Sequence, residues 1–269
     1  DVCSSDLGLP DIGRCILEIK DGKVHIRSSA ACIGQGLGTI LTQILCQTLD
    51  ITPDKVVYEA PDTRRTPDSG TTTASRQTTF TGEAVRVTAL KVKEALNGRT
   101  LDALNGQEFY GEFSGVTDKM GSDKKNPVSH VAYGFATQVV VLDENGKLKK
   151  VVAAHDVGKA INPKNVEGQI EGGVVMGLGY ALTEDYPLKN SVPTAKFGTL
   201  GLLRATAVPE IKAMVIEKNT NDLSYGAKGV GEITCIPTAP AVQGAYYKFD
   251  GVFRTKLPLE NTFYKKSKK

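Results

Sequence analysis

The chain has 269 residues, of which 40% are hydrophobic and 23% charged, enough for one large or two moderate domains with a substantial core. Lys and Arg number 33 against 30 Asp and Glu, and most of the excess lies in the C-terminal TFYKKSKK. This near balance predicts no nucleic-acid or membrane surface. No apolar stretch reaches the length of a membrane span and no secretory signal pattern opens the chain, so we expect a cytoplasmic protein.

The first eight residues, DVCSSDLG, fit neither a strand nor a helix and resemble translated adapter sequence at the end of an assembled fragment. We therefore expect residues 1–8 to be non-native. On this interpretation the chain is a piece of a longer polypeptide, and its own sequence begins near Leu9.

Five cysteines, at positions 3, 15, 32, 46 and 235, form no CxxC pair and have no histidine at metal-ligand spacing. The pattern indicates neither a disulfide framework nor a zinc or iron–sulfur site. We expect buried or inert thiols, with Cys235 as a small core residue.

Residues 9–122 are expected to form the first of two similar parts. CILEIKDGKVHIRSS alternates apolar and polar residues about an Asp-Gly turn, which predicts a β-hairpin. Glycines at 34, 36 and 38 then precede apolar residues at helical spacing, so a glycine-rich turn leads into a helix. The amide of Gln35 can either meet a ligand at the N-terminus of this helix or merely cap it.

A short strand, KVVYEA, precedes the hydroxyl-rich loop PDTRRTPDSGTTTAS, and a second helix follows that stops at Asn97. Thr73, Ala74 and Ser75 therefore lie at a helix N-terminus, where unpaired backbone amides favour an anion. An ordinary hydroxyl cap is the alternative. Periodicity fades over residues 98–128, which predicts a connection between the two parts.

Residues 123–269 are expected to form the second part. A hairpin turns at residues 144–146, and INPKNVEGQIEGGVVMGLGYAL then predicts a helix with Asn162 as N-cap and Pro163 at its first position. Its five interior glycines would each cost about 1 kcal/mol against alanine. Their presence predicts that a helix or a cofactor packs closely on the face to which Gln169 points. Both parts thus repeat hairpin, glycine-rich turn and helix, an α+β arrangement of two similar subdomains.

The other elements of the second part surround one distinctive loop. His155 and Asp156 end the hairpin, where we expect a buried hydrogen-bonded pair rather than catalytic groups. A strand is predicted for residues 211–217 and a closing helix for residues 237–249.

The distinctive loop is YGAKGVGEITCIP, residues 225–237. Its glycines at 226, 229 and 231 allow positive φ and a close approach of the backbone to a ligand. Glu232 leaves the loop for an apolar segment, and a carboxylate in such low-dielectric surroundings has a raised pKa that suits a general base. Alternatively, the glycines form a tight turn and Glu232 is an N-terminal helix carboxylate favoured by the helix dipole.

Four stretches, in this order, resemble motifs of the molybdenum hydroxylases, the xanthine dehydrogenase and aldehyde oxidoreductase family. They are GQGLGT, TTTASRQTTFTGEAV, DVGKAINPKNVEGQIEGGVVMGLG and AKGVGE. The resemblance implies that Glu232 is the active-site base and that the chain binds a molybdenum-molybdopterin cofactor, expected in its cytosine dinucleotide form. The cofactor-binding residues that it implies are Gln35, Gly36, Ala74, Ser75, Gln77, Gln169, Lys228, Gly229 and Gly231. No side chain need ligate the metal, and for Lys228 a structural surface lysine is the alternative.

The segment VSHVAYGFATQVVVLDENGKL is most similar in sequence to the bacterial selenium-dependent xanthine dehydrogenase branch. This implies hydroxylation of a purine-like heterocycle, of the xanthine or hypoxanthine class, with water as the oxygen source. An aldehyde oxidoreductase of the same family and a catalytically silent scaffold that binds the pterin or a partner subunit are the alternatives. A generic dinucleotide-binding domain fits less well, because no GxGxxG follows a strand with an acidic residue about 20 positions on.

The resemblance also implies partners. The chain would be the C-terminal half of a molybdopterin-binding domain, inactive alone, and the missing N-terminal part of the same subunit would complete the site. Iron–sulfur (2Fe-2S) and FAD groups are expected on other domains or subunits. We therefore expect an exposed apolar, glycine-lined face for the missing part, and expect Gln35, Ala74, Ser75, Gln169 and Glu232 to converge on one groove.

Overall fold

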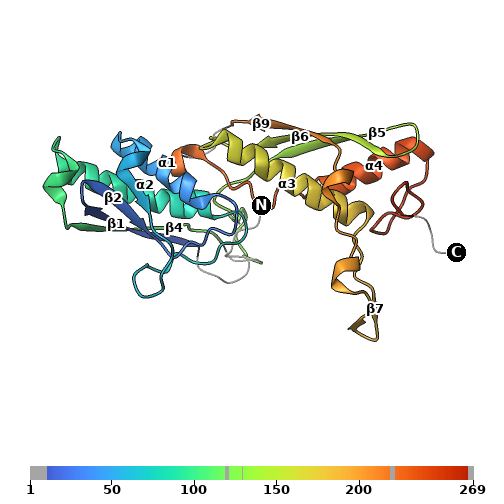
Figure 1. Cartoon of the computed structure of the whole chain (residues 1–269), viewed down its shortest axis with the longest axis horizontal. Coiled ribbons are helices and arrows are strands. Elements are labelled where there is room, and N and C mark those ends of the chain that lie inside the picture. Colours follow the sequence, from blue (N-terminus) through green and yellow to red (C-terminus); the bar gives the residue numbers. More distant parts are fainter. Residues whose placement is uncertain (1–10, 119–120, 129, 219–221, 266–269) are drawn as a thin grey trace. The chain divides into compact units, whose positions relative to one another are not determined.

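The computed structural model describes residues 11–118, 121–128, 130–218 and 222–265. The chain forms two compact units that each contain helices and strands, which confirms the predicted α+β class (Figure 1). The first unit comprises residues 1–134, 157–165 and 217–229, and the second comprises residues 135–156, 166–216 and 230–269. The border therefore differs from a single cut between residues 122 and 123, because two later segments return to the first unit. The expected non-native residues 1–8 lie outside the described residues.

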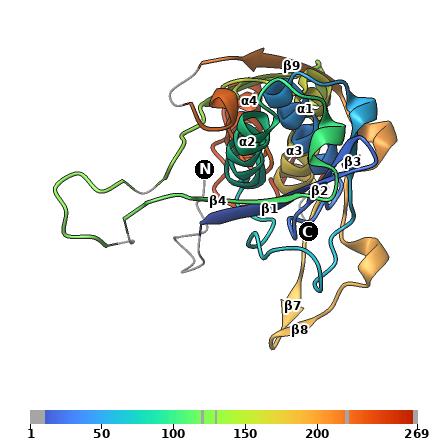
Figure 2. The same ribbon diagram turned by 90° about the vertical axis from the view of Figure 1, so that its left-hand side faces the viewer.

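The first unit is a four-stranded sheet with two helices packed on it (Figure 2). Its elements are β1 (Ile12–Lys20), β2 (Lys23–Arg27), α1 (Leu37–Leu49), β3 (Val56–Tyr58), α2 (Gln77–Leu96) and β4 (Glu108–Ser114). The strand order is β3-β2-β1-β4. The β2–β3 pair is parallel, and β1 is antiparallel to both β2 and β4.

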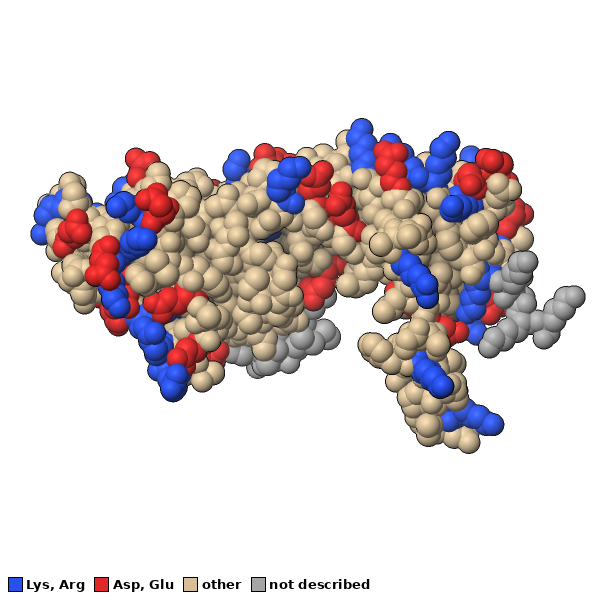
Figure 3. All heavy atoms as spheres, viewed as in Figure 1, with Lys and Arg blue, Asp and Glu red and all other residues tan. Residues whose placement is uncertain are grey.

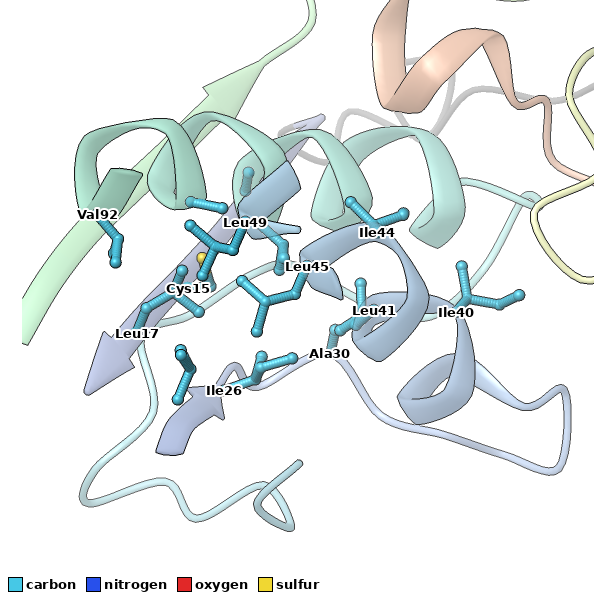
Figure 4. Close-up of a cluster of buried hydrophobic side chains, with 14 of the residues drawn as sticks. Cys15, Leu17, Ile26, Ala30, Ile40, Leu41, Ile44, Leu45, Leu49 and Val92 are labelled. Atoms are coloured by element: carbon cyan, nitrogen blue, oxygen red, sulfur yellow. The ribbon is translucent and has the colours of Figure 1, made fainter. Parts of the chain in front are cut away.

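The core of the first unit lies between the sheet and the helices. Leu17 of β1, Ile26 of β2, and Leu41 and Leu45 of α1 meet in one cluster and are all fully buried (Figure 4). Cys15 belongs to the same cluster, and its burial raises the pKa of the thiol to about 12. These side chains occupy alternate strand positions and neighbouring turns of one helix face, as the apolar pattern predicted.

Strand β4 was not predicted, because residues 98–128 were expected to be a connection. It pairs with β1 along its whole length. The positions of β4 that are at least partly buried are Phe109, Gly111 and Phe113. A Cβ on Gly111 would lie 1.6 Å from the Thr88 Oγ1 atom of α2. The glycine that allows α2 to pack against the strand therefore also interrupts the apolar alternation.

The second unit has a three-stranded sheet in the order β5-β6-β9. Its elements are β5 (Ala136–Leu142), β6 (Leu148–Asp156), α3 (Pro163–Leu182), β7 (Leu188–Lys189), β8 (Val192–Pro193), β9 (Glu210–Ile216) and α4 (Thr238–Asp250). Its core includes Val151 of β6, Ile170, Val174 and Leu178 of α3, and Tyr246 of α4. The first three residues of α3 belong to the first unit.

Several predicted elements of the second part are confirmed. Asn162 caps α3, since its Oδ1 accepts a hydrogen bond from the Asn165 backbone N–H at 3.0 Å. Pro163 is the first residue of the helix. The strand and the helix expected at residues 211–217 and 237–249 are β9 and α4, each within one residue of the expected bounds.

The two units repeat one order of elements, in more detail than the sequence suggested. In each, an antiparallel hairpin is followed by a helix, a strand parallel to the second hairpin strand, and a second helix. The order is β1-β2-α1-β3-α2 in the first unit and β5-β6-α3-β9-α4 in the second, with β7 and β8 inserted before β9.

Charged side chains of both signs are interspersed on the visible face of each unit (Figure 3). This distribution agrees with the small net charge of +3. Within the described part of the chain, every helix is too short or too polar to cross a bilayer.

Candidate functional site

Glu232 lies on an irregular turn of the second unit that precedes α4. The helix begins at Thr238, and its first turn carries no acidic side chain. The alternative in which Glu232 is an N-terminal helix carboxylate is therefore wrong. The expected apolar surroundings are not present either, because the Glu232 side chain is exposed and its neighbour Ile236 is 60% exposed. Ile233 and Thr234, by contrast, are buried and anchor the turn.

Helix α3 approaches this turn through its glycines. A Cβ on Gly173 would lie 1.9 Å from Thr234 Oγ1, and one on Gly177 would lie 2.5 Å from the Thr238 Cβ. The predicted close packing is thus confirmed for these two positions, and the turn that carries Glu232 is what packs there. At Gly168 and Gly172 a Cβ would meet no described atom within 4 Å.

Gln169 lies beside this open stretch of α3. Its side chain is half-buried and makes no hydrogen bond to another described residue. The amide is therefore available to a ligand, although its contact with a pterin stays a prediction. Farther along the same helix, Met176 is 63% and Tyr180 59% exposed. Other large exposed side chains follow in the segment after α3: Tyr186, Leu188, Val192, Phe197 and Leu202. These exposed side chains agree with the expected apolar face, and the face itself stays a prediction.

The residues just before Glu232 belong to the first unit, where α2 holds them. The Ser224 N–H donates to Glu83 Oε2 at 2.7 Å, and its hydroxyl donates to the Thr78 carbonyl at 2.7 Å. The Lys228 N–H donates to the Val157 carbonyl at 3.0 Å. Because Lys228 is only 3% exposed, the alternative of a surface lysine is wrong.

Gly229 lies directly against Ser75. A Cβ on Gly229 would be 1.7 Å from the Ser75 carbonyl oxygen, so a residue with a side chain cannot occupy this position without moving the backbone. Ala74 and Ser75 have φ values of 50° and 51°, which are unusual for residues with a Cβ and store strain of the kind found at functional sites. Two predicted cofactor-binding segments, far apart in the sequence, therefore meet in the first unit. The expected positive φ is present at Gly226, with a value of 83°, but not at Gly229 or Gly231.

The hydroxyl-rich loop does not cap α2. The N-cap of α2 is Arg76, which makes no side-chain cap hydrogen bond. The alternative of an ordinary hydroxyl cap is therefore wrong, and the positive end of the helix remains suited to an anion.

Arg76 is a site residue that the sequence reasoning missed. Its side chain is buried, and its guanidinium donates to the carbonyls of Ser69 and Thr71 at 3.0 and 3.1 Å. It also pairs with buried Asp11 at 3.5 Å. Arg76 thus fixes the loop that ends in the strained Ala74-Ser75 pair. The available signal was an arginine placed between a hydroxyl-rich loop and a largely buried helix.

Gln77 also braces this loop. Its amide donates to the Thr71 carbonyl and to Thr72 Oγ1, both at 3.1 Å, and its Oε1 accepts from the Thr81 hydroxyl. The side chain is buried and occupied by the protein itself. The structure therefore favours a bracing role over the predicted cofactor contact.

Gln35 does not cap α1. Its Oε1 accepts from the Ile33 N–H at 2.6 Å and its Nε2 donates to the Ala31 carbonyl at 3.2 Å, so the side chain braces its own loop. The N-cap is Gly36, with a φ of 81° and no side-chain cap. The alternative in which Gln35 caps the helix is therefore wrong. A groove of about 630 Å³ runs along this helix start, lined by residues that include Cys32, Gly36, Gln43 and Tyr58.

Cys32 differs from the inert thiol that the sequence predicted. It is exposed, and hydrogen bonding from the backbone amide of Gly34, with smaller contributions from Leu37, Gly36 and Gly38, lowers the pKa of its thiol. Burial instead raises the pKa of Cys15 and of Cys46. Cys235 is half-buried rather than a core residue, and its thiol donates to the Glu232 carbonyl at 3.1 Å.

We expect Cys32 to be alkylated faster than Cys15 and Cys46 when the folded chain is treated with iodoacetamide near pH 7. A lowered pKa gives Cys32 a larger thiolate fraction at neutral pH, and the thiolate is the nucleophile. Mass-spectrometric mapping of the labelled peptides over time measures the three rates, and unfolding in urea should make them similar. Equal rates in the folded chain would contradict the assignment.

His155 and Asp156 are both buried, which confirms that part of the expectation, and a hydrogen bond between them stays a prediction. The His155 Nε2 atom lies 3.2 Å from the Gln138 amide nitrogen, and burial lowers the pKa of the imidazole.

The predicted site residues divide between the two units. Gln35, Ala74 and Ser75 belong to the first unit, and Gln169 and Glu232 to the second. Their convergence on one groove stays a prediction. Among the described residues, no three His, Cys, Asp or Glu side chains gather into a group that could hold a metal ion.

Comparison with known proteins identifies the family. The family model for the molybdopterin cofactor-binding domain matches residues 6–105 and 99–209. The chain is 26% identical to the xanthine dehydrogenase molybdenum-binding subunit of Escherichia coli O157:H7, over 94% of this chain and 39% of that protein. It is 28% identical to the aldehyde oxidoreductase of Megalodesulfovibrio gigas, over 96% of this chain and 30% of that protein. The chain thus spans well under half the length of these relatives.

A solved structure agrees with this assignment. The aldehyde oxidoreductase from Desulfovibrio desulfuricans superposes with a TM-score of 0.77 at 28% identity, over 89% of this chain and 28% of that one. The family match covers the hydroxyl-rich loop, the strained Ala74-Ser75 pair and the glycine-rich α3. The chain therefore belongs to the molybdopterin cofactor-binding domain family of the molybdenum hydroxylases.

Proposed function

We propose that this chain is the molybdopterin-binding part of a cytoplasmic enzyme that hydroxylates a purine-like heterocycle of the xanthine or hypoxanthine class, with water as the oxygen source. One observation carries the proposal. The loop that ends in Glu232 passes so close to the strained Ser75 that only glycine fits at position 229, as in a loop shaped around a bound group. The name of the Escherichia coli relative supports the substrate class.

The residues of the site fit a molybdopterin cofactor. The N-cap residues of α1 and α2, Gly36 and Arg76, make no side-chain cap, and the positive ends of these helices suit phosphate and pterin oxygens. Gly229 packs directly against the backbone of the strained Ser75, and Gln169 has an amide that no described residue uses. We assign the binding of the cofactor to these residues together with Gln35, Gly36, Lys228 and Gly231. When bound, the cofactor supplies the two-electron oxidation of the substrate.

Glu232 takes the role of general base. Its carboxylate accepts the proton of the water-derived hydroxyl that forms the new C–O bond at an electron-poor carbon of the substrate. The side chain is exposed on this chain, so further parts of the enzyme must cover it to exclude water from the reaction. We propose that a part of the enzyme that corresponds to the rest of the longer relatives provides this cover. We further propose that the cofactor has the cytosine dinucleotide form, and that the 2Fe-2S clusters and the FAD lie on other domains or subunits.

A second candidate is oxidation of an aldehyde. The 28% identity with the aldehyde oxidoreductase of Megalodesulfovibrio gigas favours it. The same residues would serve, because an aldehyde also presents an electron-poor carbon to the attacking hydroxyl. A scaffold that binds the cofactor without turnover is the third candidate.

The substrate decides between these candidates. We expect the molybdenum-loaded enzyme to have a kcat/KM for xanthine or hypoxanthine at least about tenfold above that for benzaldehyde, because a site that hydrogen-bonds ring nitrogens rejects a substrate without them. Steady-state rates per bound molybdenum measure the ratio. A preference for the aldehyde would establish the second candidate, and full cofactor content without turnover of either would establish the third.

A further inference from the structure

The turn that carries Glu232 depends on a few contacts for its shape. It is irregular between Gly231 and Pro237, and the Glu232 side chain itself is exposed. Within the turn, the Cys235 N–H donates to the Glu232 carbonyl at 3.2 Å, and the Thr234 hydroxyl donates to the Gly231 carbonyl at 3.0 Å. The conformation of this turn therefore contributes to where the Glu232 carboxylate lies.

Gln138 of β5 holds this turn at two points. Its Nε2 donates to the Thr234 carbonyl at 2.9 Å, and its Oε1 accepts from the Thr238 hydroxyl at 2.8 Å. Thr234 lies two residues after Glu232, and Thr238 is the first residue of α4. One side chain therefore ties both the turn and the start of the next helix to the sheet. We call Gln138 with these two threonines the Gln138 latch.

The two threonines of the latch are buried, and helix α3 confines them on the side away from Gln138. Thr234 and Thr238 are both 0% exposed. Helix α3 lies against them without intervening side chains, because a Cβ on Gly173 would overlap Thr234 and one on Gly177 would overlap Thr238. The turn thus lies between the glycines of α3 and the side-chain amide of Gln138. Its position therefore depends on that amide.

The second hydrogen of the Gln138 amide points to His155. The two nitrogen atoms are 3.2 Å apart, so the His155 Nε2 atom must accept and the ring must be neutral. Burial lowers the pKa of His155, which favours the neutral ring. An amide is the side chain that can donate twice and accept once in this arrangement, whereas a carboxylate would face two acceptors.

We infer that Gln138 is a positioning residue for Glu232, acting through the backbone of Thr234 and the hydroxyl of Thr238. The inference rests on the proposed role of Glu232 as base. General-base catalysis requires the carboxylate within hydrogen-bonding reach of the proton that it accepts, and small displacements are costly. The amide keeps the exposed Glu232 turn in one conformation.

The test compares Gln138→Leu with Tyr246→Phe. The first removes the latch with a side chain of similar size. The second removes another buried hydrogen bond of the same unit, from the Tyr246 hydroxyl to the Gly146 carbonyl, which does not involve the turn. Both variants should lower the stability of the folded protein, so a difference between them isolates the turn.

Hydrogen–deuterium exchange of residues 231–238 is the first measurement. We expect Gln138→Leu to speed exchange of the Cys235 and Thr238 amides about tenfold, since both donate to carbonyls within the turn. Tyr246→Phe should leave this segment unchanged. This measurement does not depend on catalysis, and unchanged exchange in Gln138→Leu would overturn the inference even if Glu232 proved essential.

Kinetics of the molybdenum-loaded enzyme provide the second measurement. Gln138→Leu should lower kcat about tenfold with KM and molybdenum content within about twofold, because a displaced base affects the transition state more than substrate binding. In a Glu232→Gln background, Gln138→Leu should not lower kcat any further. Additive losses in the double variant would overturn the positioning role. Full activity of Glu232→Gln would instead overturn the proposed function, while faster exchange would still establish the latch.

Discussion

Glu232→Gln should lower turnover of the molybdenum-loaded enzyme by at least about 100-fold. The amide keeps the shape of the side chain and one hydrogen-bonding oxygen but cannot accept a proton, and general-base catalysis is typically worth about 10²- to 10⁴-fold. Because the Glu232 side chain is exposed and lies outside α4, the substitution should leave the fold and the cofactor content unchanged. The rate per bound molybdenum separates loss of chemistry from loss of cofactor.

Glu144→Gln provides the matched control. Glu144 is an exposed carboxylate at the tip of the β5-β6 hairpin in the same unit, so the same chemical change is made away from the candidate site. Its turnover should equal that of the unmodified enzyme. An unchanged rate in Glu232→Gln at full molybdenum content would remove Glu232 from the mechanism.

Gly229→Ala should destabilise the first unit and prevent cofactor binding. The added Cβ would lie 1.7 Å from the Ser75 carbonyl oxygen and 2.7 Å from its carbonyl carbon, both backbone atoms. One of the two segments must therefore move, and Ser75 already has a left-handed conformation with little freedom to adapt. We expect a loss of stability of about 3 kcal/mol, typical of severe overpacking, and molybdenum content below about a tenth of normal.

Gly244→Ala is the matched glycine control. Gly244 is an exposed position within α4, and a Cβ there meets no described atom within 4 Å. This change should stabilise the helix by about 1 kcal/mol. Urea midpoints and metal analysis of the two variants report stability and cofactor content separately. If Gly229→Ala bound molybdenum normally, the close approach to Ser75 would have no part in the site.

The fold could be predicted largely from local patterns. The Asp21-Gly22 turn, the apolar face of α1 and the Asn162 cap all depend on neighbours in sequence, and each is present. The prediction missed strand β4 because its central residue is Gly111, and glycine is required there by the contact with Thr88 of α2. Such a requirement is not visible in the strand itself. The return of residues 157–165 and 217–229 to the first unit is likewise a tertiary property.

The candidate site was less predictable than the fold. Motif resemblance located the loops, but it could not show that Gln77 is used within its own loop or that Arg76 braces it. The residue pattern after the loop predicted apolar surroundings for Glu232, but the side chain of Ile236 is 60% exposed. Each of these errors concerns the direction of a side chain, which the spacing of residues along an irregular loop does not determine.

The division of the chain between its units has a consequence for synthesis. The first unit includes residues 217–229, so it lacks part of its structure until Gly229 has been made. At about 5 to 20 residues per second, the interval between Gly134 and Gly229 lasts roughly 5 to 20 seconds. During this time the Glu83 carboxylate and the Thr78 carbonyl lack Ser224 as their partner. The nascent first unit therefore stays incomplete on the ribosome, with these two polar groups of α2 still without this partner. Chaperones have access to it during this interval.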